Sequence, residues 1–177
     1  MADISIRNIR IAGIAACVPK NVDRIADYTL ISESEREGFM KTVGVHERRM
    51  VSKGVVTSDL CAEAARQLMN KLGWDPSTIN ALVFVTQTSD YVIPSTAIIL
   101  QHRLGLPESC MAFDMNLGCS GYVVGLQVAS SLVNPTGIRR VIFLAGDVSS
   151  INMSYHDKST YPLFGDAGSA TAIEYCE

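Results

Sequence analysis

The chain has 177 residues, of which 47% are hydrophobic and 19% charged, and it carries a formal net charge of −3. This length and composition are typical of one well-cored globular domain and leave too little chain for two. No basic patch points to nucleic acid, no stretch is long enough to cross a membrane, and the N-terminus lacks the pattern of a secretory signal. Five widely spread cysteines without a C-x-x-C pair predict neither a zinc site nor disulfides, which fits a reducing cytoplasm.

The first third of the chain predicts one strand followed by mostly polar segments. Apolar residues alternate and then run together over residues 4–18, which predicts a strand that ends at Pro19. Residues 23–40 are mostly polar and predict a helix in two pieces with a solvated face. Gly44 then begins a tight turn into a short charged segment.

Helices and strands alternate through the rest of the chain. Helical spacing of apolar residues, with glycines or prolines near the ends, predicts helices at 57–72, 97–104 and 122–133. Thr57 or Ser58 is the expected cap of the first of these helices. Apolar runs predict strands at 79–86, 110–115, 141–145 and 170–173. This alternation predicts an α/β layered domain with a mostly parallel mixed sheet flanked by helices.

A cysteine stands at the turn between the predicted strand at 110–115 and the long apolar helix that follows. The amides at the start of a helix carry about half a positive charge. A thiolate there is stabilised, and the pKa of such a thiol can fall from about 8.5 to about 3.5–7.5. Gly118 and Gly121 let the backbone bend and leave room for a substrate. We therefore interpret Cys119 as an activated nucleophile whose own amide is placed to face a developing oxyanion.

Other interpretations of this turn fit the residues less well. A serine hydrolase would use Ser120, but the G-x-S-x-G pattern fails because its second glycine, Gly121, stands one place too early. The spacing of the glycines matches neither the P-loop nor the dinucleotide fingerprint. A lone cysteine is usually a small core residue, and that is the role expected of the other four: Cys17, Cys61, Cys110 and Cys176.

Four stretches of the chain together resemble a known family. They are GVHERR at 44–49, PSTA at 94–97, AFDMNLGCSG at 112–121 and FGDAGSA at 164–170. In this order and spacing they resemble the N-terminal half of β-ketoacyl-acyl-carrier-protein synthase III, a member of the thiolase-fold condensing enzymes. The resemblance extends across nearly the whole chain and implies that residues 1–177 form the first of the two similar halves of a thiolase fold.

The resemblance implies that Cys119 takes an acyl group from a thioester of coenzyme A or acyl carrier protein. The acyl-enzyme would then condense with malonyl-acyl carrier protein after decarboxylation, in the initiation of fatty acid or related lipid or polyketide synthesis. Ile93 stands where the family places a residue that reaches the partner subunit's acyl pocket in a homodimer, although an ordinary apolar residue is an equal alternative. Lys158 stands where the family has an arginine that stacks on adenine. No metal and no cofactor are implied.

The family's histidine and asparagine, which assist decarboxylation, lie in the second half of the enzyme. His46, His102 and His156 match neither of them, so the resemblance implies half an enzyme, inactive and self-associating when alone. One alternative is a non-catalytic or half-site subunit of a heteromeric condensing enzyme, and another is a thioester acyltransferase or hydrolase on the same fold. Asp166 is expected to stabilise its turn rather than to act as a catalytic acid.

Overall fold

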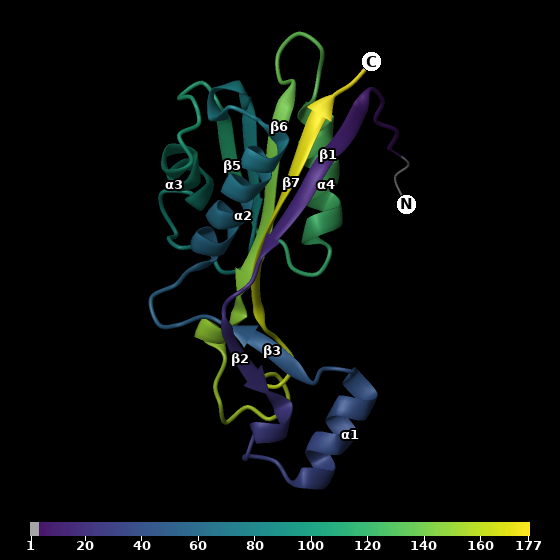
Figure 1. The fold of residues 1–177 in the computed structure, drawn as a ribbon, viewed down its shortest axis with the longest axis vertical. Coiled ribbons are helices and arrows are strands. Elements are labelled where there is room, and N and C mark those ends of the chain that lie inside the picture. The colour runs from purple at the N-terminus through teal and green to yellow at the C-terminus, as the bar shows by residue number, and fades with distance from the viewer. Residues whose placement is uncertain (1–3) are drawn as a thin grey trace.

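The protein consists of an α/β body with a smaller lobe below it (Figure 1), in a computed structural model that describes residues 4–177. The body is built on five strands: β1 (Ile9–Cys17), β4 (Ala81–Val85), β5 (Met111–Met115), β6 (Arg140–Val148) and β7 (Asp166–Tyr175). Their order is β1-β7-β6-β4-β5. β4 is parallel to β5 and β6, whereas β7 is antiparallel to β6 and β1. One strand of this sheet opposes the other four, so the predicted mostly parallel mixed sheet is confirmed.

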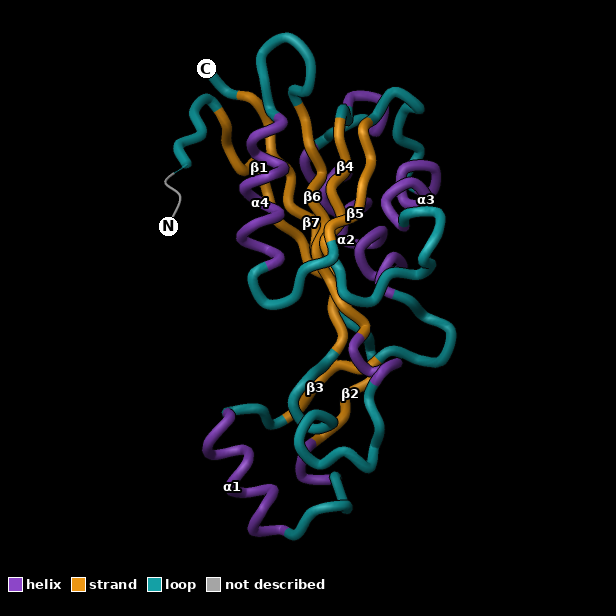
Figure 2. Tube along the Cα trace, turned by 180° about the vertical axis from the view of Figure 1, so that it is seen from behind, coloured by secondary structure: helices purple, strands orange, loops and turns teal. Residues whose placement is uncertain are grey.

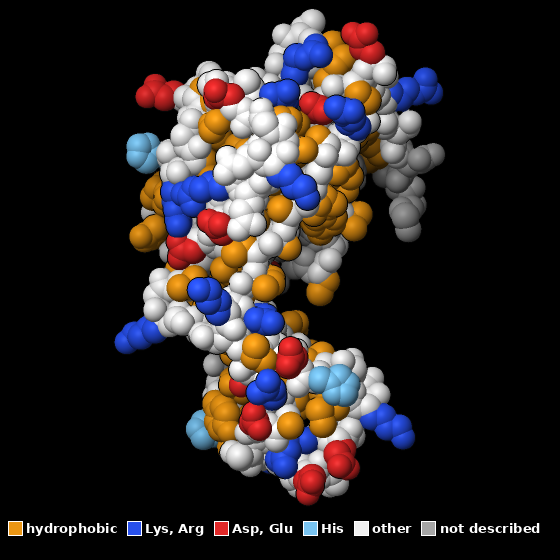
Figure 3. All heavy atoms as spheres, viewed as in Figure 1, with side chains coloured by type: hydrophobic (Ala, Val, Ile, Leu, Met, Phe, Trp, Pro, Cys, Tyr) orange, Lys and Arg blue, Asp and Glu red, His pale blue; other side chains and the backbone are white. Residues whose placement is uncertain are grey.

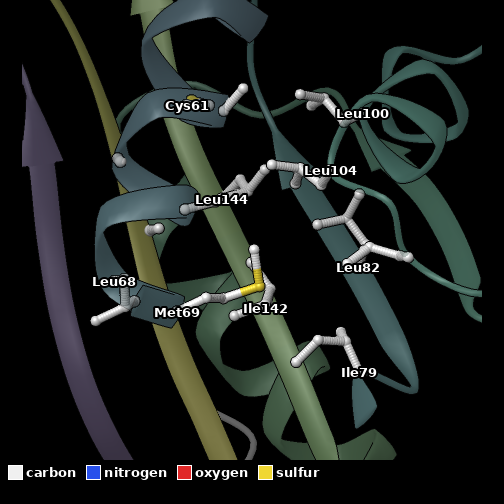
Figure 4. Close-up of a cluster of buried hydrophobic side chains, with 14 of the residues drawn as sticks. Cys61, Leu68, Met69, Ile79, Leu82, Leu100, Leu104, Ile142 and Leu144 are labelled. Atoms are coloured by element: carbon white, nitrogen blue, oxygen red, sulfur yellow. The ribbon is translucent and has the colours of Figure 1, made fainter. Parts of the chain in front are cut away.

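Helices cover both faces of the sheet, which explains the continuous apolar run of β4. The body contains α2 (Thr57–Leu72), α3 (Thr96–Arg103) and α4 (Gly121–Leu132). Leu82 and Phe84 belong to the core that β4 shares with α2 and α3, shown in Figure 4. The alternate residues Val83 and Val85 pack in the second core, on the side of α4 (Figure 2).

The smaller lobe brings together two segments that are far apart in the sequence. It holds the antiparallel pair β2 (Asn21–Arg24) and β3 (Glu47–Met50), the 3-10 turn η1 (Ile25–Asp27) and α1 (Glu33–Val43). The segment between β6 and β7, which begins with η3 (Ser149–Asn152), folds against them. Tyr28 joins the two segments, because its ring centroid lies 5.1 Å from those of both Tyr155 and Tyr161.

The predicted two-piece helix over residues 23–40 is wrong in its first piece and correct in its second. Only Asp23 and Arg24 of the first piece pair with β3, as the end of β2, where a partner some 25 residues away overrides the local preference. The 3-10 turn η1 follows them in place of an α-helix. The second piece is α1, whose start is fixed by a capping box. The Ser32 amide donates to the Glu35 carboxylate at 2.7 Å, and the Glu35 amide donates to the Ser32 hydroxyl at 3.3 Å.

The predicted cap of α2 is also wrong, although the helix begins where expected. Val56 is the N-cap residue, and its amide donates to the Asp59 carboxylate at 3.0 Å. Thr57 and Ser58 lie inside the helix and donate to groups on the loop after β4. The predicted end of α2 is confirmed, since the helix stops at Gly73 with φ of 64°. Three strands differ in length from the prediction: β1 starts only at Ile9, β6 extends to Val148, and β7 already begins at Asp166.

Exposed apolar side chains gather on one flank of the body. Figure 3 shows hydrophobic side chains over the region of β1 and α4. Ile11 and Ile14 of β1 and Tyr122 of α4 are exposed, and Val123 of α4 retains 70% of its accessible surface. A single exposed apolar residue is ordinary, whereas a group of them is typical of a surface that contacts another polypeptide.

Candidate active site

Cys119 lies between β5 and α4, directly before the N-cap residue Ser120. The Gly121 amide donates to the Gly118 carbonyl at 2.7 Å, and the Val124 amide donates to the Ser120 carbonyl at 3.0 Å, so the helical turn starts immediately after the cysteine. The Cys119 side chain is exposed. Its predicted place, reachable from solvent at the start of a helix, is therefore confirmed.

Glycines place this turn by letting α4 lie directly on the sheet. A Cβ on Gly121 would come within 2.6 Å of Val85, and one on Gly125 would come equally close to the Phe143 ring. A Cβ on Gly118 would lie 2.9 Å from the side-chain oxygen of Gln87. Gly118 and Gly121 were expected to leave room for a substrate. Gly118 does line the cavity beside Cys119, whereas Gly121 is needed for close packing against Val85.

Cys119 opens into a cleft of about 390 Å³. The cleft lies between the start of α4 and the ends of β6 and β7 nearest the lobe, with apolar walls from Leu117, Tyr122 and Phe164. Asp147 and Ser149 add polar atoms to its wall. A second cavity of about 260 Å³ shares Ser149 and Phe164 with the cleft and extends it along the loop after β4. The space beside the sulfur is therefore large enough for a small acyl group.

The Cys119 amide is a candidate oxyanion donor. Among residues 4–177, no backbone carbonyl accepts a hydrogen bond from the Cys119 amide. The amide stands at the positive end of α4 and belongs to the same residue as the sulfur. A donor in this place can stabilise the negative oxygen that forms when a thiolate attacks a carbonyl carbon.

Asp147 organises the floor of the site through a set of hydrogen bonds that the sequence did not suggest. Its Oδ1 accepts from the Thr86 hydroxyl at 2.9 Å, from the Gln87 amide at 2.7 Å and from the Thr88 hydroxyl at 3.1 Å. The Thr88 hydroxyl also accepts from the Val148 amide at 2.9 Å. The only available signal was that polar residues follow two buried strands, β4 and β6. Through the three hydrogen bonds to its Oδ1, Asp147 holds the end of β6 to the residues that follow β4.

Two further carboxylates stabilise the backbone near the site. Asp166 is only 2% exposed and accepts from the Val51 amide at 2.8 Å and from both the amide and the hydroxyl of Ser150. Asp166 therefore stabilises backbone, as predicted, but of residues 16 and 115 positions away rather than of its own turn. Asp114 accepts from the Thr96 and Ala97 amides, each at 2.7 Å, and so caps the start of α3.

Ile93 and Lys158 lie outside the residues that line the cleft around Cys119. Ile93 retains 85% of its accessible surface in the loop between β4 and α3, and the preceding Val92 is exposed as well. Lys158 is exposed in the smaller lobe, where its charge contributes to lowering the pKa of Glu35 after two larger contributions from hydrogen bonds with Ser32. The structure does not bring the three predicted site residues together, and the roles of Ile93 and Lys158 stay predictions.

The other cysteines differ in environment from Cys119. Cys61 and Cys110 are buried, and burial raises the pKa of Cys61 to about 12 and that of Cys110 to about 11. Their predicted role as core residues is confirmed. Cys17 and Cys176 are half-buried, and Cys17 packs against the core beneath α2.

The part of the chain that the structure describes contains neither a cluster of metal ligands nor a helix suited to cross a membrane. Within residues 4–177, no three His, Cys, Asp or Glu side chains are grouped to bind one metal ion. None of the described helices combines the length and the hydropathy required to span a membrane.

Comparison with known proteins identifies relatives along almost the whole chain. The model of the 3-oxoacyl-[acyl-carrier-protein] synthase III family matches residues 113–177. The β-ketoacyl-[acyl-carrier-protein] synthase III of Koribacter versatilis is 31% identical over 173 residues, which are 98% of this chain and 52% of that protein. The enzyme of the same name from Phocaeicola vulgatus is 34% identical over 168 residues, which are 94% and 50%. The chain spans about half the length of the curated relatives that it matches.

Solved structures agree with this relationship. A 3-oxoacyl-(acyl-carrier protein) synthase from Burkholderia xenovorans LB400 is 39% identical, with a TM-score of 0.94 over 97% of this chain and 50% of that chain. The 3-oxoacyl-[acyl-carrier-protein] synthase III from Aquifex aeolicus VF5 is 26% identical, with a TM-score of 0.87 over 96% of this chain and 54% of that chain. The predicted thiolase-like architecture is therefore confirmed.

Proposed function

This chain is homologous to about half of a β-ketoacyl-acyl-carrier-protein synthase III, and we propose that Cys119 is the residue that becomes acylated in a decarboxylative condensation. The observation that supports this proposal most directly is the place of the sulfur. It is exposed, directly precedes the cap of α4 and opens into a cleft of about 390 Å³. The other four cysteines are buried or half-buried and lie outside the residues that line this cleft.

In the first step, the Cys119 thiolate attacks the carbonyl carbon of an acyl thioester. A carbon–sulfur bond forms, and the oxygen carries the negative charge beside the Cys119 amide. The bond to the donor's sulfur then breaks, and the donor leaves as a thiolate that takes a proton from solvent. In the second step, malonyl-acyl carrier protein loses CO2, and the resulting carbanion attacks the acyl carbon. The bond to Cys119 breaks, which regenerates its thiolate.

Decarboxylation requires groups that stabilise the carbanion, and the described cleft contains no histidine. We therefore propose that residues 4–177 supply the nucleophile and one oxyanion donor, while the condensation step needs the histidine and asparagine of a second half. The proposed donors are thioesters of coenzyme A or acyl carrier protein, and the proposed assembly is a homodimer. The exposed apolar flank over β1 and α4 supports association with another polypeptide.

The acylation step can be tested with the protein expressed from its complete reading frame. Incubation with butyryl-coenzyme A should add one acyl group to the peptide that contains Cys119, detected by mass spectrometry. Cys119→Ser should remain unlabelled, while the control Cys176→Ser should be labelled normally. Labelling that persists in Cys119→Ser would refute the proposal.

The alternative, a thioester hydrolase on the same fold, predicts a different result in this acylation experiment. It would also form the acyl-cysteine, but it would release free acid in the absence of malonyl-acyl carrier protein. A condensing enzyme should instead retain its acyl group until malonyl-acyl carrier protein is added and should then release CO2. A half-site subunit would be acylated but would release CO2 only with a second polypeptide present.

A further inference from the structure

Phe164 and Gly165 of the cleft wall, and the adjoining residue Asp166, are held by the lobe, at β3 and the residue that follows it. Arg48 of β3 donates from Nη1 to the Phe164 carbonyl at 2.9 Å. Gly165 lies so close to β3 that a Cβ on it would be 3.2 Å from the Arg48 Cβ. Asp166 accepts from the Val51 amide at 2.8 Å. Two residues of the wall, and the residue that follows them, are therefore fixed by contacts to one short segment of the lobe.

Arg48 is unusual among the charged residues of this lobe because its side chain is only 2% exposed. Its Nε donates to the Asp23 carboxylate at 3.0 Å, and its Nη2 forms an ion pair with the same group. The guanidinium also lies over the Tyr161 ring, 4.5 Å from the centroid. A buried, paired guanidinium is held in one geometry, and its planar fork serves Asp23 and the Phe164 carbonyl at the same time.

Phe164 is the residue through which this arrangement reaches the site. Its side chain lines both the cleft around Cys119 and the adjoining cavity, and it retains 46% of its accessible surface. The core does not enclose this ring, so its position depends on the backbone that carries it. That backbone is fixed at its carbonyl by Arg48.

We propose that Arg48 is a positioning residue that holds Phe164 as the wall against which the acyl group of a bound thioester is placed beside Cys119. This proposal rests on the proposed acylation of Cys119. It also gives a role to the stretch at 44–49, whose charged side chains are otherwise typical of a solvated surface. Placement of the reacting atoms is sensitive to small shifts, because a displacement of about 1 Å can cost about 100-fold in rate.

Two reactions of the same sulfur separate positioning from simple unfolding. In the protein from its complete reading frame, Arg48→Met should lower the rate constant for acylation by butyryl-coenzyme A about 10- to 100-fold. Alkylation of Cys119 by iodoacetamide needs no wall and should stay within about 2-fold of the wild-type rate. The control Arg49→Met changes the next arginine, which is exposed, and should leave both rates unchanged. The Nη1 of Arg49 donates only long hydrogen bonds, to the Pro19 carbonyl at 3.4 Å and the Lys20 carbonyl at 3.3 Å.

A double-mutant cycle with Phe164→Ala tests whether Arg48 acts through Phe164. If it does, adding Arg48→Met to Phe164→Ala should change acylation by less than about 2-fold. Independent, multiplicative effects would overturn the proposal, and so would wild-type acylation of Arg48→Met. Should Arg48→Met fail to fold, Arg48→Lys retains the charge without the fork and is expected to show the same selective loss. Absence of acylation in the wild-type protein, with normal alkylation, would instead refute the proposed function itself.

Discussion

Gly125→Ala and Gly38→Ala each add one methyl group inside a helix, and we expect them to change stability in opposite directions. A Cβ on Gly125 in α4 would come within 2.6 Å of Phe143 and 2.7 Å of Val85. A Cβ on Gly38 in α1 would meet no other atom within 4 Å. Both substitutions gain helix propensity, about 1 kcal/mol, but only the first forces two packed layers apart.

The difference between the two variants isolates the cost of overpacking. Extra methylene groups in a packed core cost about 1–3 kcal/mol. Gly125→Ala should therefore lower the free energy of unfolding by about 1 kcal/mol, whereas Gly38→Ala should raise it by about 1 kcal/mol. Their difference of about 2 kcal/mol does not depend on the propensity gain, since both variants share it.

Urea unfolding followed by far-ultraviolet circular dichroism measures both values. The slope of the free energy against urea concentration should be the same in both variants and in the wild type, so that a shift in midpoint reports stability alone. Equal free energies of unfolding for Gly125→Ala and Gly38→Ala would show that α4 does not lie against the sheet as described. The account of how the glycines place Cys119 would then fail.

Three further outcomes are expected. Iodoacetamide at pH 8 should label exposed Cys119 well before buried Cys61, whose pKa is about 12, and equal labelling in a peptide map would contradict the burial of Cys61. Hydrogen bonds, first from the Ser159 side chain, lower the pKa of Asp157. Asp157→Asn should therefore lower the free energy of unfolding by its full amount above about pH 4, and this loss should vanish as the pH falls through the folded pKa of Asp157. A loss that does not depend on pH in an acid titration would refute this. Asp166→Ala should lower the free energy of unfolding by about 2 kcal/mol in urea, because three donors lose their acceptor, and a change below about 0.5 kcal/mol would show that they find other partners.

The residues that the sequence alone placed correctly are those governed by local pattern. The apolar run of β4 has every residue buried, and Cys119 stands at the predicted helix start. In both cases the deciding signal lies within a few neighbouring residues: continuous hydrophobicity for the strand, and glycines between a strand and a helix for the turn.

The residues that the sequence alone misplaced depend on partners far along the chain. Thr57 resembles a helix cap, but its hydroxyl donates to the Thr88 carbonyl, 31 residues away. For Arg48 the sequence analysis predicted only a short charged segment, and it missed that this side chain is buried against Asp23 and a carbonyl 116 residues away. No local pattern records such contacts, because they form only when the sheet brings distant segments together.

The chain passes between the body and the lobe four times: after β1, after β3, after β6 and before β7 (Figure 1). Because four chain segments connect the body and the lobe, neither part has much freedom to rotate against the other. The lobe also cannot assemble until loops of about 100 residues have closed, an entropic cost that the growing sheet must offset. We therefore expect body and lobe to unfold together as one cooperative unit.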